Sequence, residues 1–159
     1  MDLIVRAHMN DLNAVRELNS LLKIVEVKDF YWDTHRYVRS AILEARCFVM
    51  KNEELIKGAM ILENRSPHTG HKAESLAVGT LAIHPEFRRK GIGIRLVELA
   101  KVLASRQNKR LYADSFLEFG QQGFYKHLGF KQGVQETYNG RPYHVFFLDP
   151  TGIETSSQR

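Results

Sequence analysis

The chain has 159 residues, of which 43% are hydrophobic and 26% charged, with a net charge of +5 and an isoelectric point near 9.4. These ordinary values indicate one globular domain, and the basic balance favours anionic partners such as phosphates, nucleic acid or acidic surfaces. The cations are spread along the chain except for clusters at 88–90 and 105–110, so a solvated basic face explains the charge better than nucleic-acid binding.

One cysteine and the absence of long apolar runs exclude several classes of protein. Cys47 alone cannot form an internal disulfide or a multi-cysteine metal site, and its apolar neighbours indicate a buried residue rather than a nucleophile. No apolar run approaches the roughly 20 residues that span a bilayer, and the N-terminus lacks a secretory apolar segment. We therefore expect no membrane association and a cytoplasmic location.

The first half of the chain alternates between helical and strand-like patterns. Residues 3–7 predict a short strand, and 10–22 predict a helix capped by Asn10 or Asp11. Residues 30–45 predict a second helix in which Trp32, Val38 and Ile42 share a face. A hairpin follows, with strands at 46–51 and 55–64, and then an exposed loop at 65–74.

The strand predicted at 75–85 changes its pattern halfway. Its larger apolar residues fall on even positions up to Val78 and on odd positions from Leu81. Because side chains alternate along a strand, this switch indicates a β-bulge near Gly79 and Thr80. Burial of both faces of the strand would explain the same pattern.

The second half predicts two helices and three strands. Ile92, Leu96, Leu99 and Leu103 form an apolar stripe, which places a helix at about 91–106. A strand at 110–116 precedes a short helix that ends at Gly129, and a hairpin follows with its turn at Asn139 and Gly140. We expect a single α/β domain over residues 1–149 and a flexible tail over 150–159.

The junction "HPEFRRKGIGIRLVELA", residues 84–100, carries the strongest chemical signal. Arg88, Arg89 and Lys90 directly precede Gly91 and Gly93, where a helix begins. The first N–H groups of a helix are unpaired and carry partial positive charge, and glycines let a ligand reach them. Cations beside that helix end favour a bound anion, and phosphate is the best candidate; a tight turn with solvated cations is the alternative.

Two common phosphate motifs do not fit the junction. No Gly-x-x-x-x-Gly-Lys-Ser/Thr string occurs, which excludes a P-loop. A dinucleotide fingerprint would need a third glycine where Leu96 stands, and it would open the fold rather than follow a hairpin.

Arg88-x-x-Gly91-x-Gly93, lying in "LAIHPEFRRKGIGIRLV", resembles the acyl-CoA motif of the GNAT superfamily of N-acetyltransferases. About thirty residues later, "GFYKHLGF" is similar to the second signature of that family, a helix with a tyrosine that ends in Gly-Phe. The resemblance covers residues 74–130. It implies a mixed, mostly antiparallel central sheet of six to seven strands, splayed at a β-bulge and flanked by about four helices.

The resemblance also implies where acetyl-CoA binds. Its diphosphate would lie on the backbone of the glycine turn, formed by Arg88, Arg89, Lys90, Gly91, Ile92, Gly93 and Ile94. Its pantetheine arm would pair with the end of the preceding strand, at Leu81, Ala82 and Ile83. A backbone N–H near Ile83 would bind the oxyanion, and Tyr125 would act as the acid for the departing thiolate or bind its sulfur.

The general base is not settled by the resemblance. Some relatives carry a glutamate where this chain has Ala77. Glu74 is our candidate, acting through a water, and the others are His71, His84, Asp114 and Glu118. Acceptor choice in the family depends on the first two helices and the last hairpin, which here carry Phe30, Tyr31, Trp32, His35, Tyr138, Tyr143 and His144. Core packing explains these aromatic residues equally well.

The resemblance therefore implies an acetyl-CoA-dependent N-acetyltransferase. Its acceptor would be a primary amine of a small molecule or a protein, which attacks directly in a ternary complex; the resemblance allows a homodimer. The alternative is a CoA-binding sensor or regulatory module, because the strand glutamate is missing. A nucleic-acid-binding module is disfavoured, since the chain has no stacking motif or recognition helix.

Overall fold

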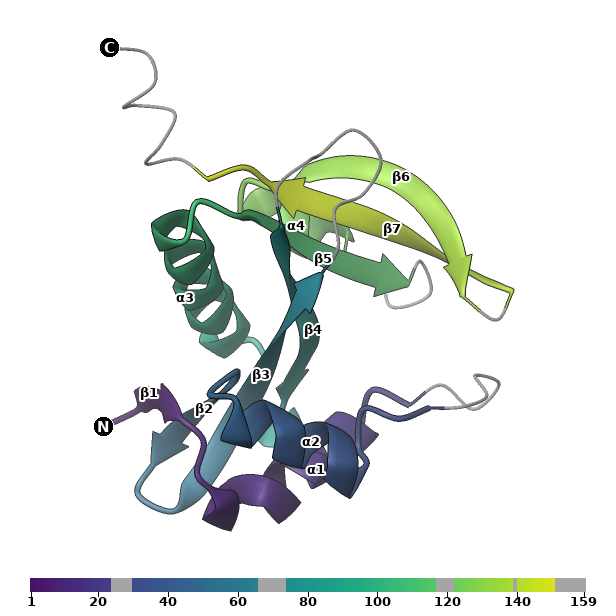
Figure 1. Cartoon of the computed structure of the whole chain (residues 1–159). Helices are drawn as coiled ribbons and strands as arrows, with labels where there is room; N and C mark the ends of the chain where they lie inside the picture. Colours follow the sequence, from purple (N-terminus) through teal and green to yellow (C-terminus); the bar gives the residue numbers. More distant parts are fainter. Residues whose placement is uncertain (24–29, 66–73, 117–121, 139, 151–159) are drawn as a thin grey trace. The chain divides into compact units, whose positions relative to one another are not determined.

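The computed structural model describes residues 1–23, 30–65, 74–116, 122–138 and 140–150, which form seven strands and four α-helices (Figure 1). In chain order the elements are β1 (Leu3–Arg6), η1 (Met9–Asp11, a 3-10 helix), α1 (Leu12–Ser20), α2 (His35–Leu43), β2 (Cys47–Asn52), β3 (Leu55–Arg65), β4 (Ser75–Ile83), η2 (Pro85–Phe87, a 3-10 helix), α3 (Ile92–Arg106), β5 (Arg110–Phe116), α4 (Gln122–His127), β6 (Lys131–Tyr138) and β7 (Arg141–Leu148).

The strands follow the sheet order β1-β2-β3-β4-β5-β7-β6. The pair β4–β5 is parallel, whereas β1–β2, β2–β3, β5–β7 and β6–β7 are antiparallel. The expected mixed, mostly antiparallel sheet with about four helices is confirmed.

By its internal contacts the chain divides into two compact units. The first consists of Met1–Leu62 and Gly79–Val97, and the second of Glu63–Val78 and Glu98–Arg159. The expectation of one domain over residues 1–149 stays a prediction. Most of the expected loop at 65–74 and of the tail at 150–159 lies outside the described residues.

In the first unit, α1 and α2 share an apolar core with β2 and β3. Val15, Val38, Val49, Ala59 and Ile61 in this core are all 0% exposed. Full burial of a Val or Ile side chain contributes about 1.5–3 kcal/mol relative to exposure, so this core anchors both helices. Cys47 belongs to the same core at 1% exposure, and burial raises the pKa of its thiol to about 12, as expected for a residue with no nucleophilic role.

The helix starts in the first unit agree with the sequence expectation in part. Asp11 is the N-cap residue of α1, as expected, but its carboxylate makes no capping hydrogen bond to α1: it accepts the backbone N–H of His8 at 2.8 Å and pairs with Lys51 at 2.7 Å. The second helix begins at His35 rather than near Phe30, because the hydroxyl of Thr34 accepts the N–H of Tyr37 as an N-cap. Trp32 therefore precedes α2 and does not share its face.

In the second unit, β5, β7 and β6 form an antiparallel ladder and α4 packs beside it. Tyr112, Ala113 and Phe146 are buried within the ladder. The hairpin between β6 and β7 is confirmed, with β6 beginning at Lys131 and Pro142 lying within β7. Asn139 lies outside the described residues, and Gly140 has a positive φ of 77°.

Two other sequence expectations concern β4 and α3. The parallel register of β4 with β5 covers Ser75–Val78 and does not reach Gly79, so the β-bulge stays a prediction. Helix α3 is confirmed, but its buried stripe consists of Ile92, Leu96, Val97, Ala100 and Ala104, whereas Leu99 and Leu103 are half-buried. Among the described residues, no helix is long and apolar enough to cross a membrane.

Candidate functional site

The turn between β4 and α3 begins with a capped 3-10 helix. The ring Nδ1 of His84 accepts the backbone N–H of Glu86 at 3.1 Å, and Pro85 occupies the first helical position. His84 is thereby engaged in capping this turn, and its ring lies 5.3 Å from that of Phe87. The short helix η2 positions the next residues, Arg88 to Gly91, in front of α3.

Gly91 opens α3 with a left-handed backbone. Its φ is +81°, and its carbonyl accepts the N–H of Arg95 at 3.1 Å, which makes it the N-cap residue. The N–H groups of Ile92, Gly93 and Ile94 then occupy the first turn, where a helix offers them no carbonyl partner. A Cβ built on Gly91 would meet no atom within 4 Å, so the space where a side chain of this residue would stand is open.

Three exposed cations precede these amides without a nearby counter-charge. Arg88, Arg89 and Lys90 are all exposed, and Arg89 also has a positive φ of 62°. Among the described residues, no carboxylate lies within 4.0 Å of their side-chain nitrogens. Arg88 Nε is 3.4 Å from the carbonyl oxygen of Ile83, which ties the first cation to the end of β4. Together with the helix end, these charges favour an anion, and the residues fit a diphosphate.

The end of β4 presents two different edges. The N–H of His84 donates to the carbonyl of Lys57 in β3 at 2.8 Å. Backbone groups of successive strand residues point to alternate edges, so the N–H groups of Leu81 and Ile83 point away from β3. Since the register with β5 covers Ser75–Val78, these two residues have no described strand partner on that edge.

A second group of charged residues, Asp2, Lys57 and Arg95, lies beside the turn and was not predicted from the sequence. Lys57 Nζ lies 3.0 and 3.2 Å from the two carboxylate oxygens of Asp2 and 4.8 Å from the centroid of the Phe87 ring. Its hydrogen bond to Asp2 lowers the pKa of that carboxyl. Arg95 donates to the backbone carbonyl of Asp2 at 3.5 Å. Nothing in the sequence pattern links residues 2, 57 and 95, because only the fold brings them together.

Gly58 in β3 is another residue that the sequence reasoning missed. A Cβ at this position would lie 2.9 Å from Ile83 Cδ1 and 2.9 Å from Ile92 Cγ2. The missing side chain therefore lets the end of β4 and the start of α3 approach β3. A glycine inside an otherwise apolar strand was the available signal, since such a glycine often marks a close approach.

Tyr125 lies in the second unit, on α4, and is 7% exposed. Its ring stacks on that of Phe146 at 5.5 Å and meets the Phe130 ring edge-on at 5.5 Å. Burial, and secondly the charge of Asp114, raises the pKa of the Tyr125 hydroxyl above its usual range. The hydroxyl is therefore protonated at neutral pH and can donate a hydrogen bond, but it is a weak proton donor.

The candidate bases occupy different environments in the described residues. The side chain of Glu74 is 84% exposed, and its carboxylate lies 3.8 Å from Lys109 Nζ. Asp114 is held by both terminal nitrogens of Arg65, at 3.2 and 3.0 Å. Ala77 is fully buried. His71 and Glu118 lie outside the described residues, so the assignment of the base stays a prediction.

The aromatic residues considered for the acceptor fall into two groups. In the first unit, the rings of Phe30 and Tyr31 each have their centroid 5.1 Å from that of Trp32, and Tyr31 is 43% exposed. His35, the first residue of α2, is exposed. In the second unit, the hydroxyl of Tyr143 donates to Glu136 at 2.7 Å, and the ring of His144 lies 3.1 Å from Gln132. The side chain of Tyr138 lies outside the described residues.

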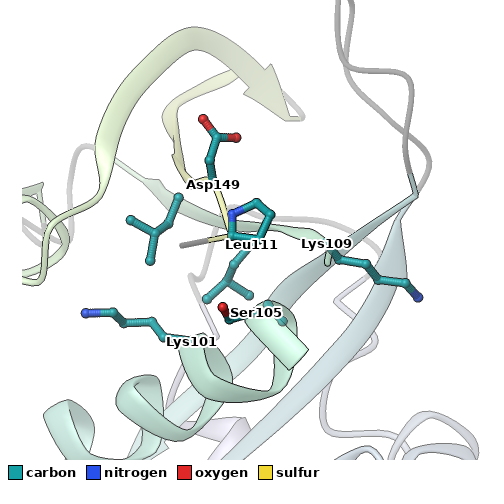
Figure 2. A pocket seen from close by; sticks show the side chains of 8 residues that line it. Lys101, Ser105, Lys109, Leu111 and Asp149 are labelled. Atoms are coloured by element: carbon teal, nitrogen blue, oxygen red, sulfur yellow. The ribbon is translucent and has the colours of Figure 1, made fainter. Parts of the chain in front are cut away.

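Two further hollows lie among the described residues, outside the turn. The first is a cavity of about 40 Å³. Its lining, shown in Figure 2, includes Lys101 and Ser105 of α3, Lys109, Leu111 of β5 and Asp149. It has room for one or two waters but not for a nucleotide. The other is an open hollow of about 500 Å³ lined by Asn13, Arg16, Glu17, Ser20 and Asp33. The described residues contain no cluster of His, Cys, Asp or Glu that could hold a metal ion.

Comparison with protein families and solved structures agrees with this geometry. Residues 44–132, more than half of the chain, match the family described as "Acetyltransferase (GNAT) domain". The chain belongs to this family of acetyltransferases, which confirms the resemblance found in the sequence. No curated protein matches the chain.

Solved structures with the same fold include two that contain CoA or a CoA analogue and one that is named an N-acetyltransferase. A chain of the NatC complex bound to Gag peptide and CoA has 14% identity and a TM-score of 0.75, covering 94% of this chain and 99% of that one. Arabidopsis thaliana Naa50 in complex with the bisubstrate analogue CoA-Ac-MVNAL has 20% identity and a TM-score of 0.73, covering 93% and 98%. The ribosomal-protein-S18-alanine N-acetyltransferase from Escherichia coli has 17% identity and a TM-score of 0.70, covering 95% of each chain.

Proposed function

We propose that the chain is an N-acetyltransferase that transfers the acetyl group of acetyl-CoA to a primary amine of a peptide, protein or small molecule. The observation that carries this proposal is the turn at residues 88–94, where three exposed cations and the open left-handed position of Gly91 directly precede the first-turn amides of α3. Membership of the GNAT family and the CoA-containing structures of similar fold support acetyl-CoA as the donor.

Acetyl-CoA would bind through two backbone surfaces of the first unit. Its diphosphate accepts hydrogen bonds from the N–H groups of Ile92, Gly93 and Ile94, while Arg88, Arg89 and Lys90 neutralise its charge. Its pantetheine amides pair with the free edge of β4 at Leu81–Ile83. The left-handed backbone of Gly91 keeps the approach open.

The reaction is a direct displacement within a ternary complex of enzyme, acetyl-CoA and amine. The neutral amine attacks the acetyl carbon, the C–N bond forms, and the C–S bond breaks with its electron pair on the CoA sulfur. A backbone N–H on this free edge of β4, near Ile83, binds the transient oxyanion. Tyr125, kept protonated by burial, donates a hydrogen bond to the departing thiolate. One proton leaves the nitrogen to water or to a base, for which Glu74 remains our candidate.

A peptide α-amine is the first acceptor to test. At pH 7 an α-amine, with a pKa of about 7.7–8.0, is roughly one-tenth neutral, whereas a lysine amine of pKa near 10.4 is about 0.04% neutral. An α-amine thus needs less help from a base, which suits a chain with Ala77 where some relatives carry glutamate. The names of three similar structures, which include peptides or a ribosomal protein, point to the same acceptor class.

The test is a calorimetric titration with acetyl-CoA followed by an acceptor screen that measures free CoA thiol. The screen includes the peptide Met-Val-Asn-Ala-Leu, an alanine-initiated peptide, an internal lysine peptide and spermidine. Binding together with amine-dependent thiol release supports the proposal. Binding without release from any amine would favour the alternative, a CoA-binding sensor or regulatory module, and absence of binding would contradict both.

A further inference from the structure

Strand β4 contains two buried hydroxyl groups without a hydrogen-bond partner. Ser75 is 0% exposed and Thr80 is 3% exposed, and neither Ser75 Oγ nor Thr80 Oγ1 makes a hydrogen bond. Buried hydroxyls are nearly always paired, because an unpaired one has lost its bonds to water and gained none. Each therefore requires a bound water, a ligand or a functional reason.

The surroundings of Thr80 single it out from Ser75. Ser75 lies in the part of β4 that pairs with β5, directly opposite Arg110. Thr80 lies past the end of that register and immediately before Leu81, the first residue proposed to pair with the pantetheine arm. Its hydroxyl is therefore the unpaired polar side-chain group next to the strand edge at which the thioester would sit.

Thr80 shares its face of β4 with an apolar residue. Side chains two residues apart share a face, so Thr80 lies on the same side as Ala82. Ala82 is 2% exposed and belongs to the apolar core with Val38 and Ile61. In such a setting a hydroxyl gains most from a partner that arrives with the substrate, since no protein group is there to satisfy it.

We propose that Thr80 Oγ1 binds the nitrogen of the acceptor, accepting a hydrogen bond from one of its N–H groups while it attacks the thioester. This rests on the proposed acetyl transfer. The C–N bond forms, the C–S bond breaks with its electrons on sulfur, and one nitrogen proton passes to water, while Thr80 keeps its own proton. A primary amine has two N–H groups, one for Thr80 and one whose proton passes to water, whereas a secondary amine has a single N–H that cannot do both. Thr80 therefore selects primary amines.

The kinetic test compares T80V with T80S and with S75A, using the best acceptor of the screen and its N-methylated form. Valine matches threonine in shape but has no hydroxyl, and S75A removes the other unpaired hydroxyl of the strand as a matched control. We expect T80V to lower kcat/KM for the primary amine about 10- to 100-fold, the effect of losing a hydrogen bond to a charged group. The preference for the primary over the N-methyl amine should fall by the same factor. T80S and S75A should keep both values, and all variants should bind acetyl-CoA as the wild type does.

Several results would overturn the proposal. These are wild-type kinetics in T80V, an equal loss for both amines, or a loss that parallels weaker acetyl-CoA binding. A crystal structure of the acetyl-CoA complex gives a readout that needs no acceptor: we expect a water on Thr80 Oγ1 about 3–3.5 Å from the acetyl carbon, where the amine would stand. A hydroxyl bonded to a backbone carbonyl would contradict the assignment. If the wild type acetylates no amine, the proposed function is contradicted independently of Thr80. The crystal structure of the acetyl-CoA complex then still tests whether Thr80 Oγ1 faces the acetyl carbon.

Discussion

Two glycines with a left-handed backbone flank helices, one at a helix N-terminus and the other at a helix C-terminus. Gly91, with φ +81°, precedes α3, and Gly129, with φ +95°, follows α4; a Cβ on either would meet no atom within 4 Å. At Gly129 the backbone groups are paired within the chain. The N–H of Gly129 donates to the carbonyl of Lys126 at 3.0 Å, and the N–H of Phe130 donates to the carbonyl of Tyr125 at 3.1 Å.

At Gly91 only the carbonyl is used, and the amides that follow remain open beside three exposed cations. The two turns share a residue type and a backbone conformation, so neither property identifies a binding site. The difference lies in which backbone groups are left unpaired and in the charge around them. A helix C-terminus whose backbone groups are hydrogen-bonded within the chain serves a structural role. A helix N-terminus with unpaired N–H groups and neighbouring cations favours a bound anion.

The largest expected effect comes from placing a negative charge at the open turn. G91E should weaken acetyl-CoA binding more than 100-fold, because its carboxylate would meet the diphosphate and its Cβ strains the left-handed backbone. Isothermal titration calorimetry measures the affinity, and a thermal melt confirms that the variant is folded. Unchanged affinity in a folded G91E protein would reject the turn as the diphosphate site.

Removal of the hydroxyl of Tyr125, which lies near the turn at Gly129, should lower the rate of the reaction rather than the affinity for acetyl-CoA. Y125F should lower kcat about 10- to 100-fold, as expected for loss of a group that assists the leaving thiolate, and leave acetyl-CoA affinity nearly unchanged. Because burial raises the pKa of Tyr125, the group stays protonated as pH rises, so its contribution to kcat should persist through pH 9. Equal turnover of Y125F and wild type across the pH range would remove Tyr125 from the reaction.

Neutralising two of the cations should produce a moderate and salt-dependent effect. The double variant R89Q/K90Q should weaken acetyl-CoA binding about 10-fold at low ionic strength and flatten its dependence on salt, since screening has fewer charges to act on. R106Q, which removes an exposed cation from the last turn of α3, is the matched control and should behave as wild type. A loss of equal size in R106Q would mean that net charge, not the turn, attracts the ligand.

The smallest effect on acetyl-CoA binding is expected from a substitution at Gly129, in the turn after α4. G129A should lower the free energy of unfolding by about 1–2 kcal/mol through its positive φ and leave acetyl-CoA affinity unchanged. Urea unfolding and calorimetry on the same preparation measure both quantities. A loss of acetyl-CoA affinity in a folded G129A protein would contradict the distinction between the two turns.

What the sequence predicts well is what local spacing determines. The glycine turn, the helix end at Gly129 and the strands of the sheet each follow from neighbouring residues, and the match to the acetyltransferase family rests on the same segment. The position of Asp11 as N-cap of α1 was predicted, but its side chain pairs with the distant Lys51 instead of capping the helix. Trp32 was wrongly assigned to the second helix, which begins after the N-cap Thr34.

Other features could not be read from spacing at all. The pairing of Asp2 with Lys57, the close approach at Gly58 and the unpaired hydroxyl of Thr80 exist only after β3, β4 and α3 are assembled. Local propensity carries no information about such contacts, which depend on which strands become neighbours. The general base belongs to the same class, because a base is defined by its environment rather than by its residue type.

The central claim is that backbone amides after Gly91 bind the diphosphate of acetyl-CoA. Titration of acetyl-CoA into the ¹⁵N-labelled protein, followed by NMR, tests it most directly. The account predicts that the amide signals of Ile92, Gly93 and Ile94 shift downfield to saturation, whereas those of Gly129 and Phe130, already hydrogen-bonded, move far less. Saturable binding that leaves the three α3 amides unmoved would contradict it.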